Sequence, residues 1–128
     1  MNQGRAVFSD DVSVKVRNRL GAQFGRVRLL VDDGTISTRL LTSWGGTAPR
    51  WLGILNVMHY TFRAADCEVE LIRGRRLSLV RQAGGGVILR GADSRRHQVE
   101  LVLSRPRTAT IGDVQRELLG AGARSTDT

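Results

Sequence analysis

Residues 66–104 decide the fold, and they read DCEVELIRGRRLSLVRQAGGGVILRGADSRRHQVELVLS. The stretch contains four short apolar runs, CEVELIR, RLSLVRQ, VILR and QVELVLS, with turn residues between them. Apolar and polar residues alternate in the first and last runs, which is typical of half-buried β-strands. We therefore expect an antiparallel meander. Because successive turns of a meander lie at alternating ends of the sheet, its first and third turns should share one end.

The two turns expected at this shared end are rich in arginine. They contain Arg73, Arg75, Arg76, Arg95 and Arg96. The guanidinium group is a planar fork that matches the oxygens of phosphate and carboxylate groups. The pattern thus predicts an anion-binding edge of the sheet, with solvated loop tips in an arginine-rich chain as the alternative interpretation.

The composition supports an anionic partner. The 128 residues include one lysine, Lys15, among 20 basic residues, and the net charge is +8. Such a charge favours nucleic acid, an anionic membrane surface or an acidic protein. The length indicates a single domain spanning residues 1–128. We expect residues 1–8 to form a loose arm and residues 121–128 a loose tail.

Cysteine and apolar content indicate the compartment. Cys67 is the only cysteine, which fits a reducing compartment and provides no spacing for a zinc site. The longest stretch without charge covers residues 51–62, which is too short to span a bilayer. We therefore expect a cytoplasmic protein without a transmembrane segment, and we expect neither a metal nor a cofactor.

Residues 9–25 fit a helix by a narrow margin. A capping serine and two acids come first, and apolar residues then recur at a four-residue spacing: Val12, Val16, Leu20 and Phe24. The competing interpretation is a strand, because Val12, Val14 and Val16 also alternate.

Residues 26–43 give the clearest hairpin, since Asp33-Gly34 is a strong two-residue turn signal. This turn predicts three pairs on one face: Val31 with Ile36, Leu29 with Thr38, and Val27 with Leu40. The same register places Arg28 opposite Arg39 on the other face, where like charges repel. Either the two side chains splay into water or an anion bridges them.

Residues 51–63 are ambiguous between helix and strand. A surface helix usually carries charges, and none occurs between Trp51 and Phe62. This favours a buried strand, or a helix that a partner chain covers. A self-associating surface would then include Trp44, Trp51, Met58 and Phe62.

A short helix should begin at Thr110, with Asp113 completing a capping box, and end at Gly120. The expected fold class is α+β, mainly β: an antiparallel sheet or small barrel of about six to seven strands with N-terminal and C-terminal helices. With a strand at 51–63, seven strands from Arg26 precede the terminal helix. This count resembles that of pleckstrin-homology-like barrels, and it also suits open sheets that build shells or dimers.

Catalytic signatures are weak. Histidine, glutamate and arginine together can cleave RNA, but His97 and Glu100 would point to opposite faces of a strand. His59 lies in the apolar stretch, which is more typical of a core or interface histidine. We therefore expect no enzymatic activity.

The function that this pattern predicts is a non-enzymatic basic module. It would contact the nucleic-acid backbone through the arginine-rich end of the sheet, together with Arg28 and Arg39, and with low sequence selectivity. The alternatives are a self-associating structural subunit and an adaptor for anionic membranes.

Overall fold

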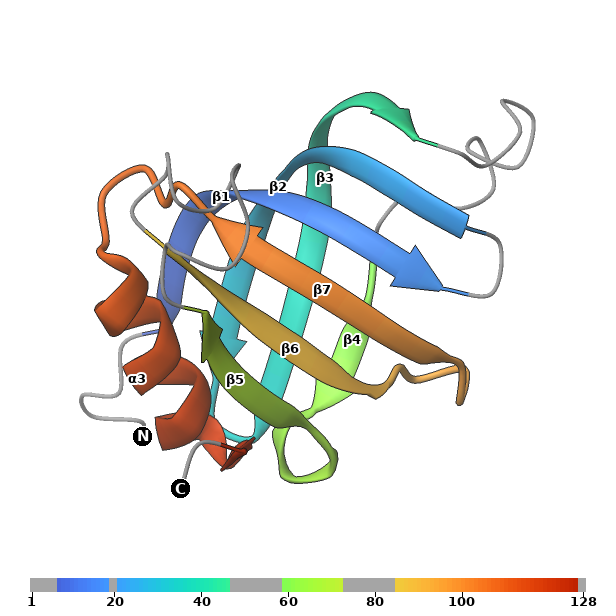
Figure 1. Cartoon of the computed structure of the whole chain (residues 1–128). Helices are drawn as coiled ribbons and strands as arrows, with labels where there is room; N and C mark the ends of the chain where they lie inside the picture. The colour runs from blue at the N-terminus through green and yellow to red at the C-terminus, as the bar shows by residue number, and fades with distance from the viewer. Residues whose placement is uncertain (1–6, 19–20, 47–58, 73–84, 127–128) are drawn as a thin grey trace.

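The computed structural model describes residues 7–18, 21–46, 59–72 and 85–126. Its described part is mainly β, with eight strands in one sheet and one C-terminal helix (Figure 1). The strands are β1 (Phe8–Asn18), β2 (Gly21–Asp32), β3 (Thr35–Gly46), β4 (Thr61–Arg63), β5 (Glu68–Ile72), β6 (Gly86–Ala92), β7 (Gln98–Ser104) and β8 (Arg124–Ser125). The helices are α3 (Ile111–Ala121) and a single 3-10 turn, η1 (Ala64–Asp66). The strand order is β4-β3-β2-β1-β7-β6-β5-β8, and only the pair of β5 with β8 is parallel.

The predicted N-terminal helix is wrong, because residues 9–25 form β1 and the start of β2. The strand forms, as the alternation of valines indicated, because residues far apart in the sequence pair with it. Strand β1 lies between β2 and β7, so its backbone is paired along both edges. Val12, Val14 and Val16 then share one face and are almost fully buried. A helix over the same residues would leave β2 and β7 without their common neighbour.

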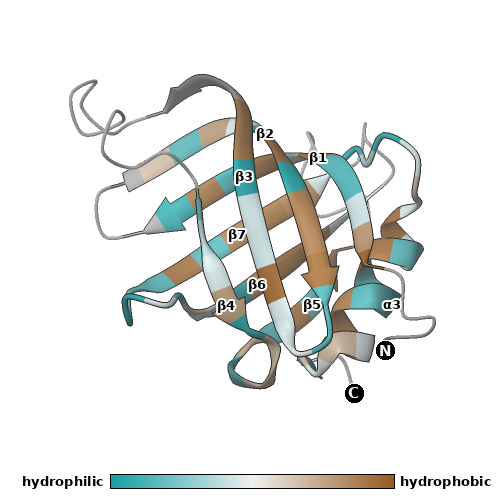
Figure 2. Ribbon diagram, turned by 180° about the vertical axis from the view of Figure 1, so that it is seen from behind, coloured by the Kyte–Doolittle hydropathy of each residue, from teal (hydrophilic) through white to brown (hydrophobic). Residues whose placement is uncertain are grey.

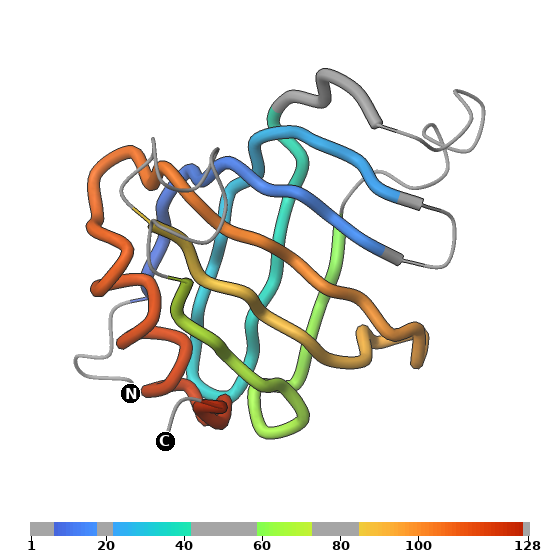
Figure 3. The backbone as a smooth tube through the Cα atoms, in the orientation of Figure 1, coloured from blue at the N-terminus to red at the C-terminus, as the bar shows by residue number. Residues whose placement is uncertain are grey.

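The predicted hairpin is confirmed. Val31 pairs with Ile36, Leu29 with Thr38, Val27 with Leu40, and Arg28 with Arg39. Gly34 has a φ of 79°, the left-handed backbone that this turn requires. Two register shifts interrupt the pairing of β2 with β3, and Figure 3 shows both strands bending strongly. Such bulges increase local twist, which lets the sheet fold back on itself.

The four-stranded meander is wrong in its pairing. Strand β5 pairs directly with β6, from Glu68 opposite Arg90 to Ile72 opposite Gly86. The run at residues 76–82, expected between them, lies outside the described residues. Ile72 stands beside the start of β6, whereas the turn with Arg95 and Arg96 follows its end. The end of β5 and the turn with Arg95 and Arg96 therefore lie at opposite ends of β6, and the prediction of a common end for the two arginine turns is wrong.

The core lies between the two halves of the curved sheet, with α3 across one end (Figure 1). Helix α3 contacts β2 and β3 from one half and β5 and β6 from the other. Figure 2 shows hydrophobic and hydrophilic bands alternating along the strands, as expected when one face packs on the core. We call the opposite face of each strand its outer face. An isolated bridge between Phe62 and Asp93 joins the short edge strand β4 to the residue after β6.

The C-terminal helix is confirmed, including its capping box. The Thr110 side chain accepts a hydrogen bond from the Asp113 N–H, and the Asp113 carboxylate accepts one from the Thr110 N–H. The helix continues past Gly120 and ends at Gly122, whose φ is 125°. The described part of the expected loose tail is ordered against the sheet, because β8 pairs with β5 and Ala123 is buried. Likewise Phe8, placed in the loose arm, belongs to β1.

The ambiguous segment at residues 51–63 is described from residue 59, and only Thr61–Arg63 form a strand, β4. Residues 51–58 lie outside the described residues. In the parts of the chain that the structure covers, no helix is both long and apolar enough to cross a membrane.

Candidate anion-binding site

Asp11 lies on the outer face of β1, at the end of a row of side chains across three strands. Asp11 is paired with Arg28 on β2, and Arg28 with Arg39 on β3. Arg28 donates from Nε to Asp11 Oδ1 at 2.6 Å. The predicted like-charge pair is therefore relieved on one side only, because the carboxylate contacts Arg28 and not Arg39.

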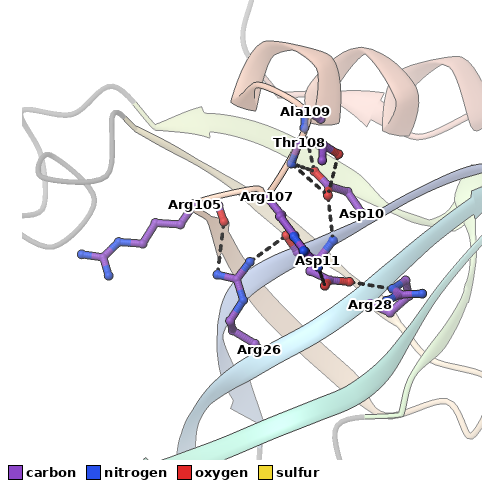
Figure 4. Close-up of polar contacts among 8 residues, drawn as sticks. All are labelled: Asp10, Asp11, Arg26, Arg28, Arg105, Arg107, Thr108 and Ala109. Carbon is purple, nitrogen blue, oxygen red and sulfur yellow. Dashed lines mark hydrogen bonds and ion pairs between the residues drawn. The ribbon is translucent and has the colours of Figure 1, made fainter.

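Two further arginines approach Asp11 from other elements (Figure 4). A terminal guanidinium nitrogen of Arg107, in the connection from β7 to α3, lies 3.6 Å from Asp11 Oδ2. Arg26, two residues before Arg28 on β2, donates to the Asp11 carbonyl oxygen at 3.0 Å and to Ser13 Oγ at 2.9 Å. The charge of Arg26 is thus held in place by neutral acceptors rather than by a carboxylate.

Arg26 also donates to the carbonyl oxygen of Arg105 at 3.3 Å. Arg105 has a φ of 50°, a left-handed conformation that is uncommon for a residue with a Cβ atom. The hydrogen bond helps to hold this turn, and the Arg105 side chain extends away from the other residues drawn in Figure 4. We name this group the Asp11 cluster, which consists of Asp11, Arg26, Arg28, Arg39, Arg105 and Arg107.

Asp10 anchors the β7–α3 connection to β1. Its carboxylate accepts hydrogen bonds from the N–H groups of Thr108, Ala109 and Asp11 and from the Thr108 hydroxyl. Burial opposes ionisation of Asp10 and would raise its pKa, but the hydrogen bonds from Ala109, Thr108 and Asp11 outweigh burial and lower the pKa. The Arg107 N–H donates to the Asp11 carbonyl at 2.9 Å, which completes the anchor.

The Asp11 cluster carries excess positive charge. The cluster holds five arginines and the single carboxylate of Asp11, which only Arg28 and Arg107 contact. The oxygens of the neighbouring Asp10 are already engaged by the backbone and by Thr108. The side chains of Arg28 and Arg107 are 45% and 72% exposed. Within the described part of the chain, the exposed side chain of Arg39 makes neither a hydrogen bond nor an ion pair. The cluster can therefore accept an external anion.

The turn with Arg95 and Arg96 is a separate positive site. Asp93 Oδ1 accepts hydrogen bonds from the N–H groups of Arg95 and His97, both at 2.9 Å, and so fixes the turn. Arg96 has a φ of 68°, and both arginine side chains are exposed. This turn precedes β7, whereas Arg105 and Arg107 follow it, so the turn and the cluster lie at opposite ends of that strand. The structure does not bring the two groups together.

The remaining predicted anion-binding residues, Arg73, Arg75 and Arg76, lie outside the described residues. Of the predicted interface residues, Phe62 is in the core, where it is 1% exposed and its ring stacks on Tyr60 at 6.1 Å between centroids. Its placement on a self-associating surface is a prediction that this burial does not support. Trp44 lies at a bulge of β3, because Ser43 and Gly45 pair with consecutive residues of β2. Trp51 and Met58 fall in an undescribed segment.

The candidate catalytic histidines, His59 and His97, are both exposed. Of the two places expected for His59, the core is therefore wrong, and an interface stays a prediction. Cys67 is fully buried, and burial raises the pKa of its thiol to about 11, with a further contribution from the charge of Asp66. No group of three or more potential metal ligands occurs among the described residues.

Sequence reasoning found Arg28 and Arg39 and missed Asp11, Arg26, Arg105 and Arg107. The signal for Arg26 was available, because it shares the outer-face parity of Arg28 in the predicted hairpin. Asp11 and Arg107 were missed because residues 9–25 were assigned to a helix.

No protein-family model, curated protein or solved structure matches this chain.

Proposed function

We propose that this protein is a non-enzymatic binding module that contacts the phosphate backbone of nucleic acid through the Asp11 cluster. The observation that carries the proposal is the charge balance of the cluster, in which five arginines accompany the single carboxylate of Asp11 and only Arg28 and Arg107 contact it. Guanidinium groups bind phosphate oxygens through paired N–H donors. Because such contacts do not read bases, binding should depend on salt more than on sequence.

Two structural features support the cluster as the contact site. Arg28 uses Nε for Asp11, so its two terminal nitrogens make no hydrogen bond with other described residues. Arg39 lies directly opposite Arg28 on β3, so an anion between them would relieve the repulsion of the pair. Apart from these two features, the hydrogen bonds of Asp10 to Thr108 and Ala109 hold Arg107 beside Asp11 without requiring the ligand to order the chain.

The test compares two double variants that remove the same charge. Affinity for a short labelled oligonucleotide is measured by fluorescence anisotropy over a range of salt concentrations. The site variant is Arg28→Gln with Arg39→Gln, and the control is Arg63→Gln with Arg116→Gln, two exposed positions on β4 and α3. We expect the site variant to lose about tenfold or more in affinity. The slope of log affinity against log salt concentration should fall in magnitude by about 1.4 to 1.8, because each of the two lost phosphate contacts contributes about 0.7 to 0.9.

A third variant, Arg95→Gln with Arg96→Gln, tests the turn predicted from the sequence. Equal losses in all three variants would show a response to net charge and would contradict a localised site. Wild-type protein that binds no oligonucleotide at low salt would contradict the proposal itself. An oligomer without such affinity would favour the structural subunit, and binding only to anionic vesicles would favour the membrane adaptor.

A further inference from the structure

We infer that the Asp11 carboxylate is an internal competitor for a phosphodiester, and that it limits the affinity of the Asp11 cluster for its ligand. The inference rests on the proposed function because it concerns the same arginines. It goes further by naming the chemical unit that the cluster recognises and the residue that opposes its binding.

The ligand class follows from how the carboxylate is held. Asp11 presents Oδ1 to Arg28 Nε at 2.6 Å and Oδ2 to a terminal nitrogen of Arg107 at 3.6 Å. Each oxygen therefore faces a different guanidinium. A phosphodiester likewise carries one negative charge over two equivalent non-bridging oxygens. The pair of arginines that brackets Asp11 can therefore bracket one phosphodiester of a nucleic-acid backbone.

The two contacts of Asp11 differ in how readily a ligand can replace them. The distance to Arg107 is longer than a hydrogen bond, and the Arg107 side chain is 72% exposed, so this contact is weak. The contact to Arg28 is short, but it uses Nε and leaves the two terminal nitrogens of Arg28 without a hydrogen bond to the described residues. A phosphodiester would thus take Arg107 from Asp11, share Arg28 with it, and gain Arg39 as a third partner. Asp11 itself stays in place, because its side chain is only 14% exposed.

The side-chain charge of Asp11 can be removed without removing the anchor of the connection. The Arg107 N–H and Arg26 both donate to the backbone carbonyl of Asp11, and the Asp11 N–H donates to Asp10. None of these bonds uses the Asp11 carboxylate. Asp11→Asn also keeps a side-chain oxygen that can accept the hydrogen bond from Arg28. The variant therefore changes charge while the surrounding backbone is retained.

The deciding measurement is the affinity of Asp11→Asn for a labelled single-stranded oligonucleotide. The control is Glu117→Gln, which removes the same charge from an exposed position on α3. We expect Asp11→Asn to bind about three- to tenfold more tightly than wild type, because a carboxylate beside the phosphate repels it at short range. The control should gain less than about twofold, because solvent and salt screen a distant charge. An equal gain in both variants, or none in Asp11→Asn, would overturn the inference.

A second probe separates this inference from the proposed function. Dimethyl phosphate, a phosphodiester without bases, is titrated into both proteins while the Arg28 Nε–H resonance is followed by NMR. A larger shift in Asp11→Asn than in wild type, together with no affinity for oligonucleotide in either protein, would support the competitor and overturn nucleic-acid binding. Oligonucleotide binding that Asp11→Asn does not strengthen would overturn the competitor alone. Asp11→Ser is a second neutral variant if near-ultraviolet circular dichroism shows that Asp11→Asn is misfolded.

Discussion

Two regions on the outer face of the sheet hold arginines against carboxylates, and they differ in charge balance. On β6, Arg90 contacts Glu70 Oε1 at 3.0 Å and Glu100 Oε2 at 3.1 Å. Arg17 on β1 lies 3.9 Å from the other oxygen of Glu100, so two arginines share two glutamates. In the Asp11 cluster, five arginines accompany the single carboxylate of Asp11, which only Arg28 and Arg107 contact. Counted over these described residues, the first region is neutral, whereas the second retains positive charge that an external anion can neutralise.

The difference shows that the arginine content alone does not define a binding surface. Burial would lower the pKa of Arg90, but hydrogen bonds and charges from Glu70 and Glu100 outweigh this and raise it. The charge of Arg90 is thus committed to cross-strand pairs within the sheet. Arg28 has Asp11 on one neighbouring strand and Arg39 on the other, so a second basic residue stands where Arg90 has a second acid. Whether the neighbouring strands carry a second acid, as for Arg90, or a second arginine, as for Arg28, decides which of the two is available to a ligand.

The largest expected effect comes from removing the anchor of the unbalanced region. Asp10→Ala deletes the acceptor for the N–H groups of Thr108 and Ala109. Since these part-buried donors would lose a charged acceptor, we expect the free energy of unfolding to fall by about 1 to 3 kcal/mol. Urea denaturation at neutral pH measures the loss. The ion pairs of Arg90 should be unchanged, because no residue of that network contacts Asp10.

Acidification should remove the contribution of Asp10 to the free energy of unfolding. The pKa of Asp10 is lower in the folded protein than in the unfolded chain, so its contribution is complete above the ordinary value of about 4 and is lost as the pH falls below it. Wild type should lose more stability than Asp10→Ala when the pH is lowered from about 5 to about 3, a range that brackets the ordinary pKa of aspartate. Glu117→Ala is the exposed control. Parallel acid limbs for wild type and Asp10→Ala would contradict the account of Asp10.

The second prediction converts the unbalanced region into a copy of the balanced one. Arg39→Glu places an acid on each side of Arg28, as Arg90 has Glu70 and Glu100. We expect affinity for an oligonucleotide to fall more than about tenfold, because one phosphate partner is lost and a repulsive charge is added. Stability should rise by about 0.2 to 1 kcal/mol, as for other opposite-charge pairs across strands.

The matched control for Arg39→Glu is Arg63→Glu, which reverses an exposed charge on β4. Anisotropy titrations and urea denaturation of both variants give the comparison. If Arg63→Glu weakens binding as much as Arg39→Glu, the position of Arg39 has no special role and the cluster is not the contact site.

Local signals predicted those parts of the fold that short segments determine. The Asp33-Gly34 turn fixes the register of its own hairpin, and that register placed Arg28 opposite Arg39 correctly. The capping box of α3 is likewise contained within four residues, Thr110 to Asp113. The end of that helix was misplaced because Gly120 and Gly122 are both able to stop a helix, and only the packed structure selects the second.

The candidate site was not predictable as a whole, because it depends on contacts between distant segments. Asp10 and Asp11 looked like the acids of a first helical turn, a function that such residues often serve. The partners of Asp10 are Thr108 and Ala109, and the Asp11 carboxylate contacts Arg28 and Arg107. Only the placement of β1 between β2 and β7 brings these residues together. The pairing of β5 with β6 across residues 73–84 removed the basis for the other expected arginine site for the same reason.

The smallest expected effect comes from unbalancing the region around Arg90. Glu100→Gln removes the acid that Arg90 and Arg17 share, while Glu70 still pairs with Arg90. We expect affinity for an oligonucleotide to rise by only about twofold, because one acid remains and the freed charge is screened by solvent. Anisotropy measurements beside Glu117→Gln and Asp11→Asn, which remove the same charge elsewhere, provide the scale. A gain as large as that of Asp11→Asn would mean that total charge, rather than the surplus of arginine around Asp11, governs binding.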